Sequence, residues 1–364
     1  PILEYLLQAY DSVDEIPETV LIPMQDQEVL QLPKDEIAPI YDTLSQLYEG
    51  GDLEKTLRVA PFNAHLVAGL SDVSMQWLGD RKLMQLADKL KHFERIEPVA
   101  PASGLKAELR PYQAFGLSWL QFLYEHGFNG VLADDMGLGK TLQTLSWLQR
   151  LKEAGELSEP ALLVLPTSLI ANWKQEATRF TPDLNLLTLH GSDRAMRFDQ
   201  IAHSDLVLTT YPLLPRDQAV FKAHAFKVII LDEAQKIKNP RTQLYAALVQ
   251  LKAQHRLCLT GTPVENHLGE LWSLFNFLMP GFLGNQPFFK KHYQKPIELE
   301  GDRALQERLT NKVAPFLLRR TKHQVAQELP DKTEIIKTVE FEPAQARLYE
   351  TIRVAMEEKV QIGR

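Results

Sequence analysis

The amino-acid sequence predicts an α/β fold in which a doubly wound parallel sheet is covered by helices on both faces. Two observations lead to this prediction. Between about residues 130 and 280, short apolar segments typical of buried strands alternate with segments whose apolar residues recur at helical spacing. Glycine, hydroxyl and carboxylate residues follow the apolar segments, and in such sheets ligands bind at the carboxyl ends of the strands.

Five segments have the apolar character of buried strands. They cover residues 130–133, 161–165, 205–211, 228–231 and 256–260. The segment after the first of them is predicted to be a helix, because Leu142, Leu145, Leu148 and Leu151 recur at spacing three and Gly155 follows. From residue 264 onward the pattern becomes helical.

The loop after the first predicted strand has the composition of a phosphate-binding loop. Residues 134–141 read Asp-Asp-Met-Gly-Leu-Gly-Lys-Thr, and a helical pattern starts directly after them. Glycines let backbone N–H groups approach phosphates, and a helix N-terminus adds the positive end of its dipole. Lys140 is expected to pair with the β- and γ-phosphates, and the Thr141 hydroxyl to bind Mg²⁺. The strict pattern has glycine where Asp134 stands, so this stretch alone leaves a surface turn as the alternative.

An acidic pair follows the aliphatic strand predicted at residues 228–231. Asp232 at a strand end can hold Mg²⁺, usually through water, and the adjacent Glu233 can position and deprotonate an attacking water. A surface turn with two acids is the alternative, and the strand before it and the loop upstream disfavour that alternative. Gln113, upstream of the loop, can read an adenine edge because its amide offers a donor and an acceptor.

The composition is that of an ordinary globular protein. The 364 residues are 45% hydrophobic and 24% charged, which suggests two or three domains. The net charge of −7 argues against nucleic acid coating the whole surface, but it permits a local basic groove. No apolar run reaches the roughly 18 residues of a membrane span. The single cysteine, Cys258, favours a reducing compartment and a core position.

Five sequence blocks resemble, in this order, the first motor lobe of the SWI/SNF-like ATPases of helicase superfamily two. They are residues 109–113, 133–141, 232–235, 259–263 and 316–322. The resemblance spans about residues 105–350, and an aspartate at the position of Asp134 is normal for the family. It implies a RecA-like lobe that binds ATP and Mg²⁺ and tracks along double-stranded DNA without separating the strands.

The resemblance also assigns roles to single residues. It implies that the nucleotide is bound by Arg110, Gln113, Met136, Gly137, Leu138, Gly139, Lys140 and Thr141. Catalysis would involve Lys140, Glu233 and Gln235, and the metal would be bound by Thr141 and Asp232. Many members of the family have histidine where Gln235 stands. Coupling of nucleotide state to DNA contact would involve Thr260, Gly261 and Thr262.

Contacts with DNA phosphates are expected at two strand ends and in a basic segment. The strand ends are Pro166, Thr167 and Ser168 and Thr209, Thr210 and Tyr211. The basic segment contains Arg319, Arg320 and Lys322, and residues 311–327 around it hold no acid. Basic side chains of this kind can line a phosphate backbone, and an ordinary solvated helix face is the alternative.

The chain is expected to divide into five parts. They are a mainly helical accessory domain at 1–97, a linker at 98–104, the RecA-like lobe at 105–280, a helical extension at 281–332 and the start of a second lobe at 333–364. Apolar stripes within 37–47 and 83–93 suggest the helices of the first part. The chain starts with Pro1 and is expected to be a piece of a longer protein whose second lobe supplies arginines to the ATP site. This fragment is therefore expected to bind ATP but barely hydrolyse it.

Three functions remain open at this point. The first is an ATP-driven translocase on double-stranded DNA that remodels protein–DNA complexes, with a DNA-bound protein as a further partner and no membrane. The second is an ATP-gated switch that grips nucleic acid or a partner without stepping, and the third is an RNA or single-strand helicase. Residues 1–97 are similar to the segment that bacterial members carry, which implies a cytoplasmic location at the bacterial nucleoid.

Overall fold

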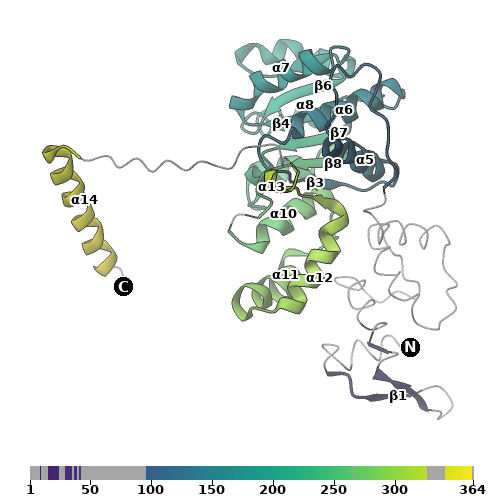
Figure 1. The fold of residues 1–364 in the computed structure, drawn as a ribbon, viewed down its shortest axis with the longest axis vertical. Coiled ribbons are helices and arrows are strands. Elements are labelled where there is room, and N and C mark those ends of the chain that lie inside the picture. The colour runs from purple at the N-terminus through teal and green to yellow at the C-terminus, as the bar shows by residue number, and fades with distance from the viewer. Residues whose placement is uncertain are drawn as a thin grey trace. The chain divides into compact units, whose positions relative to one another are not determined.

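The computed structural model describes residues 9, 15–23, 29–34, 37–38, 41, 96–264, 266–325 and 341–362. The chain divides into two compact units, Pro1–Val325 and Ala326–Arg364, and each is considered by itself. The first unit contains a seven-stranded sheet with helices around it (Figure 1). No helix among these residues is long and apolar enough to cross a membrane.

The seven-stranded sheet is parallel throughout. Its strand order is β5-β6-β4-β7-β8-β3-β9. The strands are β3 (Gly130–Leu132), β4 (Ala161–Leu165), β5 (Leu186–Thr188), β6 (Leu206–Thr210), β7 (Ala225–Asp232), β8 (Lys252–Leu259) and β9 (Leu317–Leu318). The five predicted strands are confirmed as β3, β4, β6, β7 and β8. The edge strands β5 and β9 are additions that the sequence pattern did not indicate.

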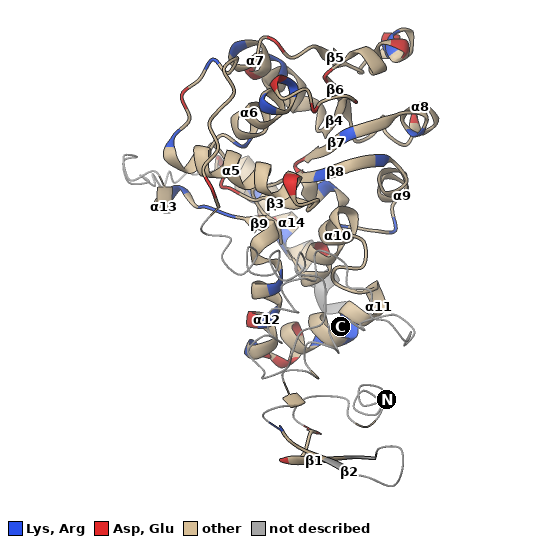
Figure 2. Cartoon of the chain, turned by 90° about the vertical axis from the view of Figure 1, so that its right-hand side faces the viewer, with Lys and Arg blue, Asp and Glu red and all other residues tan. Residues whose placement is uncertain are grey.

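Helices cover both faces of this sheet. On one side lie α5 (Pro111–Glu125), α6 (Lys140–Glu153) and α7 (Ile170–Phe180), and on the other lie α8 (Gln218–Ala223), α9 (Gln243–Val249) and α10 (Leu268–Leu278) (Figure 2). This arrangement confirms the doubly wound RecA-like fold. Beyond α10, a helical extension contains α11 (Gln286–Phe289), two π-helical segments over 290–300 and α12 (Arg303–Val313).

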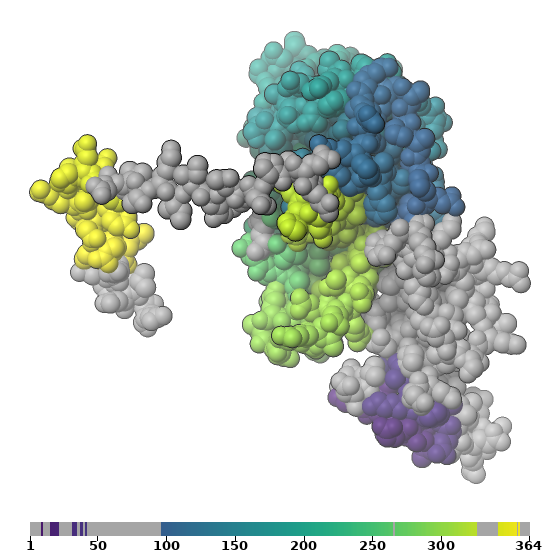
Figure 3. All heavy atoms as spheres, in the orientation of Figure 1, coloured from purple at the N-terminus to yellow at the C-terminus, as the bar shows by residue number. Residues whose placement is uncertain are grey.

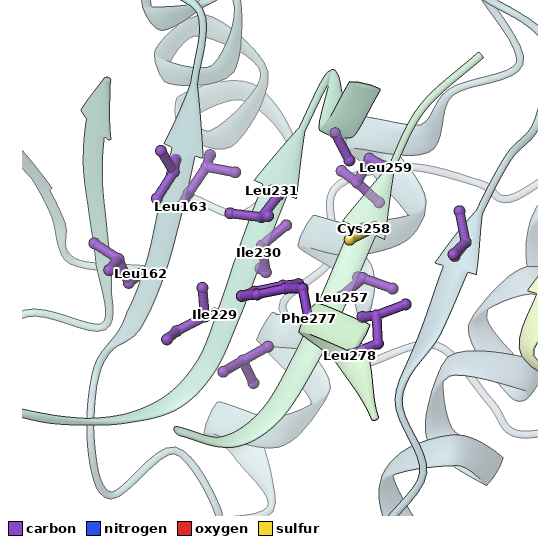
Figure 4. Packing of buried hydrophobic residues seen from close by; sticks show 14 of the residues in the cluster. Leu162, Leu163, Ile229, Ile230, Leu231, Leu257, Cys258, Leu259, Phe277 and Leu278 are labelled. Atoms are coloured by element: carbon purple, nitrogen blue, oxygen red, sulfur yellow. The ribbon is translucent and has the colours of Figure 1, made fainter. Parts of the chain in front are cut away.

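One part of the core lies where the central strands meet α10, and buried side chains of α5, α6 and α7 form another. Figure 4 shows apolar side chains of β4, β7 and β8 gathered around Phe277 and Leu278. Every residue of β4 is buried, as the near-continuous apolar strands of a sheet covered on both faces require. Full burial of one large aliphatic side chain contributes about 1.5–3 kcal/mol. Cys258 belongs to this core, and burial raises the pKa of its thiol.

The strand register brings the ends of the central strands to one level. Leu132 at the end of β3 is paired with Leu259 at the end of β8, and Leu259 is paired with Asp232 at the end of β7. On the other side of β7, Leu231 is paired with Val164 of β4. The residues that follow these strands therefore meet at one edge of the sheet, which is where a parallel sheet binds ligands.

The structure describes the parts on either side of the lobe only in places. The described residues of 1–97 include an antiparallel pair, β1 (Thr19–Pro23) and β2 (Val29–Pro33), which the prediction of a mainly helical domain did not contain, and most of that domain lies outside the described residues. Both predicted helical stripes lie mostly outside the described residues. The second unit contains α14 (Pro343–Ile362), whose Leu348, Ile352 and Met356 side chains are exposed within that unit. The strand predicted at 333–341 lies almost entirely outside the described residues.

Residues 98–104, predicted to be a linker, are hydrogen-bonded to helices of the sheet unit. The Val99 N–H donates to Ser118 Oγ of α5 over 3.1 Å. The Gly104 N–H donates to Glu153 Oε1 of α6 over 2.7 Å, and Arg150 Nη1 donates to the Ala100 carbonyl over 3.0 Å. These contacts hold the segment along the α5–α6 side of the sheet unit.

Candidate functional site

The loop between β3 and α6 has a backbone that requires glycine. Gly137 and Gly139 have φ angles of 88° and 78°, in the left-handed region that L side chains rarely adopt. Gly139 is also the N-cap of the 14-residue helix α6. A Cβ atom at Gly139 would lie 2.5 Å from Gln113 Nε2, so a larger residue there would also have to displace that side-chain amide. A narrow glycine loop that opens a helix suits the phosphates of a nucleotide.

Lys140 lies across this loop. Its Nζ donates to the carbonyl oxygen of Asp134 over 2.6 Å and to that of Asp135 over 3.3 Å. Burial lowers the pKa of Lys140, while the negative charges of Asp134, Asp232 and Glu233 act in the opposite direction. The ammonium therefore lies among acidic groups and carbonyl oxygens at the sheet edge. A triphosphate with its Mg²⁺ matches this pairing of one cation with several carboxylates.

Gln113 connects the start of α5 with the same loop. Its Oε1 accepts from the Arg110 N–H over 3.0 Å, and its Nε2 donates to the Leu138 carbonyl over 3.2 Å. Gln113 is buried, whereas Met136 at the loop tip is 70% exposed. The predicted nucleotide-binding residues are thus brought together around one loop. Their contacts with adenine or phosphate remain a prediction.

Asp232 is oriented by two N–H donors. Trp173 of α7 donates its indole N–H to Asp232 Oδ2 over 2.7 Å, and the Glu233 backbone N–H donates to Oδ1 over 2.9 Å. Burial raises the pKa of Asp232, and the Trp173 hydrogen bond opposes that rise. Sequence reasoning missed Trp173 as a site residue. The one sequence signal that could have indicated this role is the indole N–H of Trp173, since a buried tryptophan usually finds a hydrogen-bond partner.

Glu233 has an unusual backbone conformation. Its φ of 53° makes it the one non-glycine residue with a positive φ in the described part of the chain. For a residue with a Cβ this region is sparsely populated, and such strain is typical of functional positions. In the same turn, the Glu233 N–H donates back to the carboxylate of Asp232. Asp232 and Glu233 therefore form a turn of defined conformation with an internal hydrogen bond, rather than two adjacent surface acids.

A chain of side-chain hydrogen bonds leads from Glu233 to the end of β8. Gln235 Nε2 donates to Glu233 Oε2 over 2.7 Å, and Thr260 Oγ1 donates to Gln235 Oε1 over 3.0 Å. The Thr262 N–H then donates to Thr260 Oγ1 over 3.0 Å. These contacts join two blocks that the sequence analysis assigned separately to catalysis and to coupling.

The two strand ends predicted to contact DNA differ in exposure. Thr167 and Ser168 are exposed in the short 3-10 helix before α7. Thr209, Thr210 and Tyr211 are buried. Thr209 Oγ1 donates to the Leu189 carbonyl over 3.3 Å, and Tyr211 Oη donates to the Asp232 carbonyl over 2.6 Å. The predicted phosphate contacts of these three side chains do not agree with this arrangement, because the hydroxyls of Thr209 and Tyr211 are used inside the protein.

The three predicted basic contacts also differ among themselves. Arg319 and Lys322 are exposed. The Arg320 side chain is only 11% exposed and forms an ion pair with the fully buried Asp134. Arg320 is therefore corrected from a DNA contact to an internal residue. The partner stands 186 positions earlier in the chain, so the local sequence around Arg320 did not indicate it.

Comparisons with known proteins give a consistent result. Residues 112–363 match the family model of the SNF2-related domain. The chain is 41% identical over 277 residues to the putative ATP-dependent helicase/translocase YwqA of Bacillus subtilis. This match covers 75% of this chain and 30% of that protein. It is 37% identical over 305 residues to the TATA-binding protein-associated factor BTAF1 of Arabidopsis thaliana, covering 78% of this chain and 15% of that protein. The chain thus spans less than a third of these curated relatives.

A solved structure agrees with the sequence comparisons. The Sulfolobus solfataricus SWI2/SNF2 ATPase core in complex with dsDNA has a TM-score of 0.60 and 42% sequence identity to this chain. The match covers 70% of this chain and 53% of that one.

Proposed function

Since this chain belongs to the SNF2-related family of ATPases, we propose that its sheet unit binds ATP with Mg²⁺ and drives movement along double-stranded DNA. The observation that supports this best is the convergence of Lys140, Asp232 and Glu233 at one sheet edge. Their charges act on one another, although they come from two strand ends about 90 positions apart. The chain's own residues therefore supply a cation for phosphates and a carboxylate for the metal.

Each group has a role that its geometry supports. The Lys140 ammonium would leave the two loop carbonyls and pair with phosphate oxygens. Thr141 and Asp232 would hold Mg²⁺, which supplies charge neutralisation at the phosphates when bound. Glu233 would accept the proton of the attacking water. Gln235 would hold the Glu233 carboxylate in place and connect it with Thr260.

A DNA partner is proposed on two grounds. The similar Sulfolobus core was solved with double-stranded DNA. In this chain, Thr167, Ser168 and Arg319 are exposed polar or basic groups of the segments predicted to contact phosphates. Trp173 lies on the helix that follows Thr167 and Ser168, and it donates to Asp232. A phosphate contact at the start of this helix would therefore be connected to the proposed metal ligand Asp232 through the helix and the Trp173 hydrogen bond.

The wider function is proposed to be remodelling of protein–DNA complexes. A relative is named as a TATA-binding protein-associated factor, which supports a DNA-bound protein as the target. A second motor lobe of the same parent protein would complete the ATP site with arginines. Because residues 1–97 are similar to the segment that bacterial members carry, we further propose a location at the bacterial nucleoid.

The deciding experiment measures ATP turnover by the parent protein with different nucleic acids. Duplex DNA should stimulate turnover more than single-stranded DNA or RNA. Preference for RNA or single strands would favour the unwinding helicase. A directional displacement assay with a third DNA strand then separates a stepping motor from an ATP-gated switch, because a switch grips DNA without displacing that strand.

A further inference from the structure

We propose that Arg320 is a positioning residue for the phosphate loop, and that it acts through its ion pair with Asp134. The inference rests on the proposed function, because it concerns how the loop of that ATP site keeps its shape. It assigns a role to a basic residue that the sequence pattern grouped with DNA contacts. It also explains why a carboxylate stands where the strict loop pattern has glycine.

The guanidinium of Arg320 has a partner for each of its nitrogens. Its Nε donates to Asp134 Oδ1 over 2.8 Å, and Nη2 donates to Asp134 Oδ2 over 2.5 Å and to Gln143 Oε1 over 2.7 Å. Nη1 donates to the Tyr112 carbonyl, and the guanidinium lies 5.3 Å from the centre of the Tyr112 ring. A two-pronged contact of this kind fixes orientation as well as charge.

The backbone around Arg320 follows the start of the loop. The Ala133 N–H donates to the Leu318 carbonyl over 2.7 Å, and the Asp135 N–H donates to the Arg320 carbonyl over 2.9 Å. The Lys322 N–H donates to Asp135 Oδ2 over 3.0 Å. The backbone pairing of β9 with β3 thus continues past the strand into the phosphate loop. The space-filling view shows the yellow-green atoms of the chain after α12 directly against the blue region of β3 to α6 (Figure 3).

Asp134 connects the Arg320–Asp134 ion pair with Lys140. Asp134 accepts from Arg320 with its side chain and from Lys140 Nζ with its carbonyl oxygen. Gln143, in the first turn of α6, accepts from Arg320 and donates to Asp134 Oδ2 over 3.1 Å. Asp134 and Gln143 are fully buried, so water does not replace a lost contact. The position of Asp134 therefore sets the backbone from which the Lys140 ammonium meets phosphates.

Loss of one partner alone would confuse positioning with stability, because it leaves a buried charge unpaired. The test variant is therefore the double substitution Asp134→Asn with Arg320→Gln, which removes both charges together. The more conservative variant Arg320→Lys keeps the positive charge and loses the two-pronged contact with the Asp134 carboxylate. A matched control is Arg194→Gln. Arg194 also makes a two-pronged pair, with Asp217, near the opposite edge of the sheet.

The measurement is binding of a fluorescent ADP analogue to this chain, with the melting temperature of each variant recorded beside it. We expect the double variant and Arg320→Lys to bind about tenfold more weakly at temperatures where they are folded. Arg194→Gln should lower the melting temperature and leave the affinity unchanged. Wild-type affinity in the folded double variant or in folded Arg320→Lys would overturn the proposal. A wild-type chain that does not bind the analogue would instead overturn the proposed function.

A measurement on the unaltered chain covers the case in which the variants do not fold. Coupling between two sites is reciprocal, so nucleotide must stabilise the segment that positions the loop. Amide hydrogen exchange of residues 317–322 should slow at least severalfold when the ADP analogue is added. Exchange in η7 (Ser192–His203), which contains Arg194, should not change. Unchanged exchange in 317–322 with bound analogue would also overturn the proposal.

Discussion

The side-chain amide of Gln235 donates a hydrogen bond to Oε2 of Glu233 over 2.7 Å. The same amide accepts from Thr260 at the end of the neighbouring strand β8. The amide therefore connects the residue proposed to accept a proton with a segment proposed to respond to DNA. Its removal should affect turnover far more than nucleotide binding.

Gln235→Ala tests this connection. Without the amide, the Glu233 carboxylate loses its support, and the general-base contribution of about 10²–10⁴ should be partly lost. We expect DNA-stimulated ATP turnover of the parent protein to fall at least about tenfold, with nucleotide affinity within a factor of about two. Gln235→His is the control, since many members of the family have histidine there, and it should retain most turnover. Normal turnover in Gln235→Ala would show that the connection is not needed.

Glu233→Gln separates binding from hydrolysis. The amide has nearly the shape of the carboxylate but does not accept the proton of water, so turnover should fall by at least about 100-fold. Calorimetry should show ATP binding close to that of wild type. Turnover at the wild-type rate would remove Glu233 from the catalytic role.

Trp173→Phe tests the orientation of Asp232. The change keeps an aromatic ring in the core but removes the N–H that donates to Asp232 Oδ2. Groups that orient a metal ligand typically contribute 10–100-fold in metal affinity, so about tenfold more Mg²⁺ should be needed for half-maximal binding of ADP·Mg²⁺. Trp147→Phe is the matched control, because the buried Trp147 Nε1 has no hydrogen-bond partner in the described residues. An equal Mg²⁺ requirement in the two variants would contradict the role of Trp173.

His255 on β8 should make stability depend on pH. Full burial lowers the pKa of His255 to about 3. The aromatic rings next to its imidazole are those of Trp147 and Tyr124. The unfolded chain binds a proton near pH 6.5, whereas the folded chain does not until about pH 3, so stability is complete above pH 6.5 and falls below it. Wild type should lose about 2 kcal/mol more than His255→Phe between about pH 7 and pH 5. Denaturant unfolding at both pH values measures this, and parallel losses in the two proteins would contradict it.

The sequence indicated the central part of the fold because local patterns determine it. The strand predicted at 161–165 is β4 residue for residue, and the predicted phosphate-loop helix lies within α6 (Lys140–Glu153). A buried strand with neighbours on both sides must be apolar throughout, which leaves a clear local signal. The residues directly after these strands then fall at one edge by topology alone.

The sequence did not indicate the features that depend on distant partners. Strand β9 has only two residues, and it is a strand because β3 lies beside it. Arg320 has the same local appearance as the exposed Arg319, and only the fold shows that Asp134 pairs with it. Likewise, the hydroxyls of Thr209 and Tyr211 at a strand end looked available to a ligand, but they donate to backbone carbonyls inside the protein.

Lys140 and its loop are proposed to bind the phosphates of ATP, and calorimetric titration of ATP·Mg²⁺ into this chain measures that binding. Hydrogen bonds between charged groups contribute about 1.5–3 kcal/mol, so Lys140→Ala should weaken binding by roughly 10–150-fold. The wild-type chain should bind one nucleotide saturably, and a nearby exposed substitution, Lys236→Ala, should leave that affinity unchanged. Equal affinity of wild type and Lys140→Ala would show that Lys140 does not bind the phosphates, and no saturable binding by wild type would show that the loop is not a nucleotide site.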